Sequence, residues 1–226
     1  KLYEGIDLHG ETTGLITYMR TDGVQIANEA LSSCRKTIEN EFGKNYLPNK
    51  PRIYHTKAKN AQEAHEAIRP TNLSLLPRDL SSFLNKNELA LYELIWKRTI
   101  ASQMESAKLE NTSVDISTTD EKNIFRATGQ VILFDGFLKL YQESKDDDNE
   151  SGNGPSQLPR LNKSEDLSSN KIIPKQHFTD PPPRYSEASL VKKLEELGIG
   201  RPSTYASIIS TIANRGYAEI VNKRFF

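Results

Sequence analysis

The polar tract at residues 144–170, SKDDDNESGNGPSQLPRLNKSEDLSSN, constrains the fold more than any other part of the chain. Its Asp, Asn, Ser, Gly and Pro residues cannot bury enough apolar surface to form a core, so we predict a mobile surface loop between strands. The acidic run at 146–148 is expected to be part of this solvated loop rather than a metal site. A length of 226 residues with 36% hydrophobic content then favours several small domains.

Apolar side chains recur at helical spacing before this tract, within residues 1–102. The pattern predicts three helices, at 24–42, 60–71 and 86–101. Gly43 ends the first helix, Asn60 is the expected N-cap of the second, and Pro70 terminates that second helix. Residues 1–102 are therefore predicted to be mostly helical.

The pattern changes to alternation after residue 102. NTSVDIST (111–118) and NIFRATGQ (123–130) predict a hairpin with a turn at 119–122. VILFDGFLKLY (131–141) predicts a further strand with a turn or bulge at Gly136. A last short strand is expected at 171–173, so the middle of the chain is predicted to be rich in β-structure.

The C-terminal portion has the clearest supersecondary pattern. It predicts a helix from Ser186 to Leu197 that Gly198 ends, a tight turn, and a second helix that Gly216 closes. A strand (YAEIV) and an Asn-Lys turn follow. Helix, turn, helix, strand and turn predict a winged helix-turn-helix, in which the N-terminus of the second helix faces phosphates. The chain starts and ends inside such patterns, so we expect it to be an excised fragment.

Charge and cysteine content exclude several classes of protein. The 30 basic and 30 acidic residues cancel, but residues 145–170 carry three basic and six acidic side chains, whereas residues 171–226 carry nine and five. A polyanion is therefore a plausible partner at the C-terminal end. One cysteine, Cys34, and four scattered histidines leave neither a disulfide nor a zinc cluster, and Cys34 is expected in a core. Without a long apolar run or a signal peptide, we expect a cytoplasmic chain with no membrane segment.

Tyr18 in GLITYMRTDG is the first candidate for chemistry. A tyrosine phenol has a pKa of about 10, so an attacking role requires a cationic neighbour. Arg20 lies two residues away and offers two parallel donors to a phosphate. A phenol that attacks a phosphodiester forms an aryl phosphate from which the displaced hydroxyl can reseal the strand without ATP. From spacing alone the Tyr-x-Arg pair is weak evidence, and a half-buried packing tyrosine is the favoured interpretation.

Two further groups could bind phosphate. His65 and Arg69 would share one face of the predicted helix at 60–71, although a solvent-facing ion-paired helix explains them equally well. The sequence HEAIR lacks the second histidine of a zinc-protease motif. The turn and second helix of the C-terminal portion carry the other group, which comprises Arg201, Ser203, Thr204, Tyr205 and Arg215, although a Pro-Ser-Thr helix start also serves as an ordinary cap.

Three long motifs together resemble the type IA DNA topoisomerases. GLITYMRTDG resembles the active-site tyrosine motif of that family, and QEAHEAIRPT and YSEASLVKKLEELGIGRPSTYASIISTIANRGY resemble two further blocks in the same order. The resemblance implies that Tyr18 becomes linked to a DNA 5′ phosphate while Arg20 and His65 hold the scissile phosphate. Thr21 and Asp22 would shape the site, and the C-terminal group would bind single-stranded DNA together with Arg69.

The resemblance also implies an architecture, a multi-domain α+β fold. Residues 1–102 resemble a helical CAP-like domain that holds the nucleophile, 103–177 part of a β-rich arch, and 178–226 a truncated winged helix. The family's Toprim domain, with its acidic Mg²⁺ cluster, has no counterpart, so we expect no metal site or cofactor here and no activity from this chain alone. Gly23 stands where many relatives have serine, which leaves Asp22 as the expected cap of the following helix.

The implied function of the full-length protein is an ATP-independent isomerase reaction. It would cleave one strand through a 5′-phosphotyrosine, pass the other strand and reseal, which relaxes negative supercoils. Such a protein is expected to be a monomer that binds single-stranded or negatively supercoiled DNA in the bacterial nucleoid. The alternatives are a non-catalytic single-stranded DNA-binding module, a tyrosine recombinase and a scaffold protein.

Overall fold

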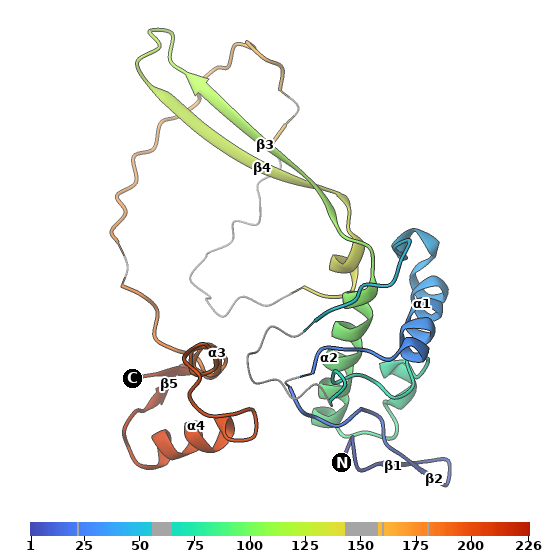
Figure 1. Cartoon of the computed structure of the whole chain (residues 1–226). Helices are drawn as coiled ribbons and strands as arrows, with labels where there is room; N and C mark the ends of the chain where they lie inside the picture. The colour runs from blue at the N-terminus through green and yellow to red at the C-terminus, as the bar shows by residue number, and fades with distance from the viewer. Residues whose placement is uncertain (22, 56–64, 143–157, 160, 180) are drawn as a thin grey trace. The chain divides into compact units, whose positions relative to one another are not determined.

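The part of the chain that the structure describes forms helices and three small two-stranded sheets, which is a mixed α and β fold (Figure 1). The computed structural model describes residues 1–21, 23–55, 65–142, 158–159, 161–179 and 181–226. These residues belong to two compact units, and each unit is described by itself. The first unit contains residues 1–110 and 132–145, and the second contains residues 111–131 and 146–226.

Two α-helices dominate the first unit, α1 (Asn28–Phe42) and α2 (Lys86–Gln103). Asn85 caps α2, because its side chain accepts hydrogen bonds from two backbone N–H groups of the first turn and Glu88 bonds back to the Asn85 N–H. The prediction of this helix is confirmed. The first predicted helix is confirmed from Asn28 onward, whereas residues 24–27 lie outside the helix.

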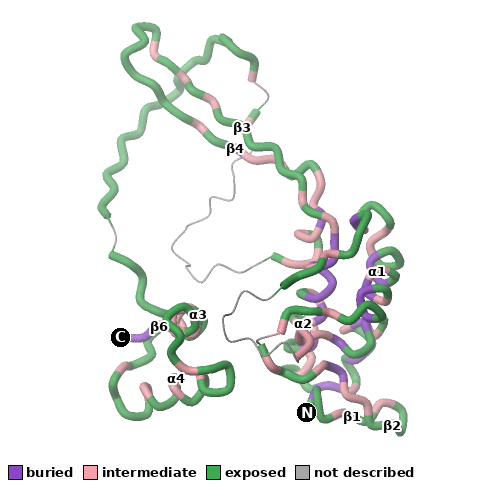
Figure 2. Tube along the Cα trace, viewed as in Figure 1, coloured by how far each residue is buried: buried purple, intermediate pink, exposed green. Residues whose placement is uncertain are grey.

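The remaining elements of the first unit are short. They are β1 (Ile6–Leu8) and β2 (Glu11–Thr13), which pair antiparallel, and the 3-10 helices η1 (Lys44–Tyr46), η2 (Pro77–Leu80) and η3 (Gly136–Lys139). A hydrophobic core lies between α1, α2 and the loops around them (Figure 2). Its least exposed members are Leu15, Cys34, Ile38, Leu73, Leu80, Tyr92, Ile100 and Met104. Burial raises the pKa of the Cys34 thiol to about 12, so the prediction of a core cysteine is confirmed.

The helix predicted at 60–71 is wrong for its described part. Residues 60–64, including the expected N-cap Asn60, lie outside the described residues. Residues 65–71 form no helix, because their backbone bonds to a distant segment: the Thr17 N–H donates to the Arg69 carbonyl and the Thr71 N–H donates to the Leu15 carbonyl. Pro70 and Ile16 form an antiparallel β-bridge. Long-range backbone pairing thus replaces the local helical pattern.

The central hairpin is confirmed and is longer than predicted. β3 (Lys108–Ser117) pairs with β4 (Ile124–Phe134), and residues 118–123 form the turn (Figure 1). The separate strand expected from residue 131 is wrong, because residues 131–134 continue β4 and the chain then turns into η3. The strand expected at 171–173 is also wrong, because these exposed residues are irregular.

The C-terminal part of the second unit contains two helices and a small hairpin. α3 (Glu187–Leu197) starts at its N-cap Ser186 and ends at Gly198, whose backbone is left-handed. α4 (Tyr205–Asn214) follows, and β5 (Ile220–Val221) pairs antiparallel with β6 (Arg224–Phe225). The predicted succession of helix, turn, helix, strand and turn is confirmed, although the strand covers fewer residues than expected.

Candidate functional site

Tyr18 lies at the surface of the first unit, directly after a buried segment. Leu15 and Ile16 are buried, whereas the Tyr18 side chain is 51% exposed. Two aromatic rings flank it: the Tyr3 ring centroid lies 5.4 Å away at 65°, and the His65 ring centroid lies 5.8 Å away at 33°. The phenol is therefore accessible to a ligand and has an imidazole beside it.

Backbone pairing between distant segments brings His65 to Tyr18. Thr17 and Ala67 are 50 positions apart in sequence, yet the Thr17 hydroxyl donates to the Ala67 carbonyl at 2.7 Å. Gly23 also lies against the segment that contains His65. A Cβ at Gly23 would stand 2.1 Å from the His65 carbonyl oxygen, so only glycine fits without displacement. The absence of a serine at position 23 therefore has a steric reason here.

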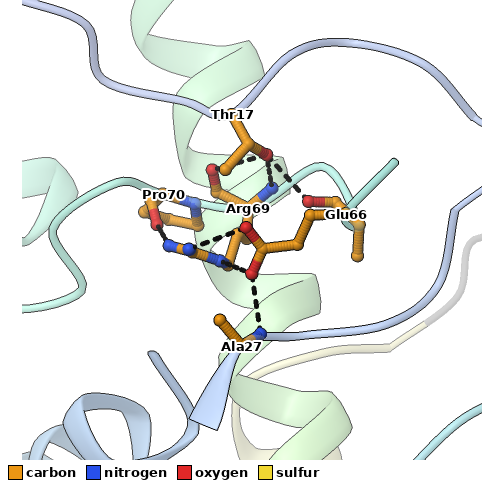
Figure 3. A network of polar contacts seen from close by, with 6 residues as sticks. Thr17, Ala27, Glu66, Arg69 and Pro70 are labelled. Carbon is orange, nitrogen blue, oxygen red and sulfur yellow. Dashed lines mark hydrogen bonds and ion pairs between the residues drawn. The ribbon is translucent and has the colours of Figure 1, made fainter. Parts of the chain in front are cut away.

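A network of polar contacts joins these two segments to the start of α1 (Figure 3). The Glu66 carboxylate accepts from Arg69 Nε at 2.7 Å and from Arg69 Nη2 at 3.0 Å. The same carboxylate accepts from the Ala27 N–H at 2.8 Å. Arg69 also donates from Nη1 to the Pro70 carbonyl at 2.9 Å and from its backbone N–H to the Thr17 hydroxyl at 3.0 Å.

The electrostatics of Glu66 follow from these contacts. Partial burial acts to raise the pKa of its carboxyl, but the hydrogen bonds from Arg69 and Ala27 together outweigh burial and hold the pKa below its usual value. The Arg69 side chain is 12% exposed and that of Glu66 is 30% exposed. Most of the Arg69 guanidinium therefore faces protein groups rather than solvent.

The other residues of the tyrosine motif follow along the chain. The Arg20 backbone N–H donates to the Tyr18 carbonyl at 2.9 Å, which tightens the turn after the tyrosine. Thr21 is exposed and lines an apolar cavity of about 640 Å³ between the motif and α2, together with Met19 and Gly23. Asp22 lies outside the described residues. The expectation that Asp22 caps the following helix is wrong, because the N-cap of α1 is Ala27.

The predicted nucleic-acid contacts of the C-terminal region lie along α4. Arg201, Ser203 and Thr204 are exposed before its first turn. The Thr204 hydroxyl accepts from the Arg201 N–H at 2.8 Å, so this threonine shapes the turn. Arg215 is the C-cap of α4, at the end opposite Arg201. Ten residues of helix separate these arginines by about 15 Å, so a ligand that touches both must be extended.

Sequence reasoning missed three contributions to the site. Tyr3 packs edge to face with Tyr18, Thr17 bonds the segment of Arg69, and Glu66 binds the start of α1. The pairing of Glu66 with Arg69 could be suspected from their spacing, but no local signal links either residue to Thr17 or Ala27. In the part of the chain that the structure describes, no three His, Cys, Asp or Glu side chains gather as metal ligands.

Comparisons with known proteins agree over the whole chain. The family model described as DNA topoisomerase matches residues 1–226. DNA topoisomerase 1 of Rickettsia bellii is 56% identical over 225 residues, which cover 100% of this chain and 28% of that protein. DNA topoisomerase 1 of Xylella fastidiosa (strain Temecula1 / ATCC 700964) is 52% identical over 227 residues and is likewise covered to 28%.

A solved structure of a topoisomerase is also similar to this chain. Full-length topoisomerase I from Thermotoga maritima matches with a TM-score of 0.76 and 35% identity, over 100% of this chain and 35% of that chain. The chain thus spans less than a third of the length of these two curated relatives. None of the described helices is long and apolar enough to cross a membrane.

Proposed function

Because the chain belongs to the bacterial type IA DNA topoisomerase family, we propose that it supplies the nucleophile and part of the DNA-binding surface of an ATP-independent topoisomerase. The complete enzyme would relax negative supercoils by opening one strand, passing the other and resealing. The observation that carries this proposal is the exposed Tyr18 phenol with the His65 ring 5.8 Å away.

The proposed chemistry needs only a phenol and a phosphodiester. The Tyr18 oxygen attacks the phosphorus, a Tyr–O–P bond forms, the bond from phosphorus to the 3′ oxygen breaks, and the phenol proton is balanced by the proton that the leaving 3′ hydroxyl gains. The 5′ phosphate stays on the protein. Attack by the same 3′ hydroxyl reverses each bond change, so the strand is resealed without an external energy source.

The neighbours of Tyr18 have proposed roles in this exchange. Arg20 and His65 would hold the non-bridging phosphate oxygens and stabilise the charge that develops on them. Thr21 and Asp22 would shape the site around the phosphate. The distance of 5.8 Å between the ring centroids of Tyr18 and His65 supports a phosphate position that both side chains reach.

The domains of the proposed enzyme follow the family resemblance. Residues 1–102 would form the CAP-like nucleophile domain, 103–177 part of the arch around the strand-passage opening, and 178–226 a winged helix. The last of these would hold single-stranded DNA through Arg201, Ser203, Thr204, Tyr205 and Arg215. Arg201 and Arg215 are both exposed and lie at opposite ends of α4, which supports a ligand with the shape of an extended strand.

We assign Mg²⁺ to another part of the complete enzyme, a Toprim domain with its own acidic cluster. The described residues hold no group of three potential ligands, so the residues present do not fit such an ion and no step here depends on it. We expect these 226 residues by themselves to neither cleave nor relax DNA. The complete enzyme is expected to act as a monomer.

Replacement of Tyr18 tests the proposal in the full-length protein. Tyr18→Phe removes only the hydroxyl, so we expect relaxation and the covalent protein–DNA adduct to fall to background while DNA binding is largely retained. Plasmid relaxation, adduct formation on a labelled oligonucleotide and a binding titration measure these three properties. The loss should be complete because no other described group replaces the phenol oxygen in this mechanism.

Tyr3→Phe is a matched control. Tyr3 is 43% exposed, close to the 51% of Tyr18, and the two rings contact each other. We expect this variant to keep relaxation within about twofold of the unmodified protein. Full relaxation by Tyr18→Phe would contradict the proposal and favour the alternative, a non-catalytic single-stranded DNA-binding module.

A further inference from the structure

Two residues of the polar network are covalently next to the two rings of the candidate site. Thr17 directly precedes Tyr18, and Glu66 directly follows His65. Neighbouring Cα atoms are about 3.8 Å apart, so displacement of Thr17 or Glu66 moves the adjacent ring. Whatever fixes Thr17 relative to Glu66 therefore also fixes Tyr18 relative to His65.

Arg69 makes that connection with both its backbone and its side chain. Its backbone pairs with Thr17: the Arg69 N–H donates to Thr17 Oγ1 at 3.0 Å, and the Arg69 carbonyl accepts from the Thr17 N–H at 2.9 Å. Its guanidinium holds both carboxylate oxygens of Glu66, at 2.7 and 3.0 Å (Figure 3). A fork of two parallel hydrogen bonds restricts rotation as well as distance.

Glu66 adds a third attachment, to the helix that follows the tyrosine motif. Its Oε1 accepts from the N–H of Ala27, the N-cap of α1, which has no side chain of its own to cap the helix. A carboxylate at this position is also favoured by the helix dipole. The segment of His65 is thus held on one side by Thr17 and on the other by α1.

We propose that Glu66 and Arg69 are positioning residues that hold His65 against Tyr18, and that neither contacts DNA. This inference rests on the proposed function. It gives Arg69 a different role from the DNA contact that the family resemblance suggests. The low exposure of its side chain, 12%, and its bonds to Glu66 and Pro70 support the positioning role.

The test compares binding with catalysis in the full-length protein. Arg69→Lys keeps the charge but cannot form the two-pronged contact, and Glu66→Gln keeps the shape but loses the charge. We expect single-turnover formation of the covalent adduct at saturating oligonucleotide to slow by about tenfold to a hundredfold, because small misplacements of reacting groups are costly. The Kd for the same oligonucleotide should stay within about twofold.

A charge-reversed double variant separates positioning from general loss of structure. Glu66→Arg combined with Arg69→Glu restores an ion pair, but the arginine at 66 cannot accept from the Ala27 N–H. We therefore expect the double variant to recover part of the rate lost by each single reversal. All rates are measured at a temperature at which circular dichroism shows every variant to be folded.

Arg78→Lys is the matched control, because Arg78 forms an exposed ion pair with Glu41 in the same unit, at 3.1 Å. Its rate and Kd should be those of the unmodified protein. A weakened Kd with an unchanged cleavage rate in Arg69→Lys would show that Arg69 contacts DNA, and this outcome would overturn the inference. Unchanged rates in both single variants would also overturn it.

These failures are distinguishable from failure of the proposed function. If Tyr18→Phe is inactive and the Glu66 and Arg69 variants behave like the unmodified protein, only the positioning role is wrong. If Tyr18→Phe still forms the adduct, the proposed nucleophile is wrong, whatever the variants of the pair do.

Discussion

The helix α1 of the first unit and the helices α3 and α4 of the C-terminal region have similarly amphipathic sequences, but the helices of the two regions differ greatly in burial. α1 and α2 contribute buried side chains such as Cys34, Ile38 and Tyr92, whereas neither α3 nor α4 contains a buried residue (Figure 2). Leu197 at the end of α3 and Ile199 just after it are at least half exposed. An apolar stripe thus produces a helix in both regions but a well-filled core in only one.

The difference matters for the two halves of the proposed function. The Tyr18 segment begins at buried Leu15 and Ile16, so the proposed nucleophile lies next to the hydrophobic core of the first unit. Arg201 and Arg215 flank α4, which contains no buried residue, so local opening there should cost less free energy. The proposed chemistry, which requires fixed distances, is therefore assigned to the unit with this core, and the proposed strand binding to helices that bury less.

Truncation of one isoleucine in each region should have the largest effect and tests the comparison directly. Ile38→Ala should lower the free energy of unfolding by about 3 kcal/mol, because Ile38 is fully buried. Ile212→Ala in α4, where the isoleucine is half-buried, should cost about 1 kcal/mol. Denaturant titration followed by Trp96 fluorescence reports the first loss, and amide exchange of α4 reports the second. Equal losses would remove the contrast between the regions.

A side chain at Gly23 should have the next largest effect. Gly23→Ser places a Cβ against the His65 carbonyl, so we expect a loss of about 2 kcal/mol in the stability of the first unit and a slower cleavage step. Thermal unfolding and single-turnover kinetics measure the two effects. Gly216→Ala in the C-terminal region is the control for backbone strain alone. The φ of Gly216 is +68°, but no atom lies within 4 Å of the position that its Cβ would take. A fully stable and active Gly23→Ser would show that the His65 segment shifts freely, which contradicts a rigid site.

Acid should weaken the first unit through Glu66 by a smaller amount. Because the folded-state pKa of Glu66 is lowered, its stabilisation is fully present above its unfolded pKa, about 4.3, and is lost as the pH falls through the lower folded value. We expect Glu66→Gln to be less stable than the unmodified protein by about 1.5 kcal/mol at pH 7. The difference should shrink below pH 4 in denaturant titrations. A pH-independent difference would assign the effect of Glu66 to packing.

Loss of one exposed arginine of the C-terminal region should have the smallest effect. Arg201→Ala should leave folding stability unchanged and weaken binding of single-stranded DNA a few-fold. The slope of log K against log salt concentration should decrease by the amount that corresponds to about one phosphate contact. Arg78→Ala removes the same charge from the first unit and should leave DNA binding and its salt dependence unchanged. Titrations at several salt concentrations check this. An equal loss in both variants would show that DNA is attracted by overall charge rather than by α4.

Much of the fold was predictable because its signals are local. The Asn85 cap, the Gly198 stop and the turn at 118–123 each depend on a few adjacent residues, and the corresponding elements are where the patterns predict them. The helix predicted over His65 to Thr71 failed for the opposite reason. Its spacing is helical, but its backbone groups bond to Leu15 and Thr17 instead.

The sequence proposes some members of the candidate site but not its geometry. The motif resemblance identifies Tyr18, Arg20 and His65 as a set, yet it does not state which side chain lies beside which. The sequence also leaves Gly23 as an unexplained departure from the family pattern. The close approach of the His65 carbonyl explains it, and that approach depends on where a distant segment runs.

By itself, therefore, the amino-acid sequence determined most of α1, the helices α2, α3 and α4, the β3–β4 hairpin and the family, because caps, periodicity and motifs are encoded within short windows. Tertiary structure alone decided that Tyr18 meets His65 and that Glu66 and Arg69 link their segments to α1. These contacts join positions as many as 52 residues apart. They form only when the core fixes both segments, since no local preference brings such distant backbone groups together.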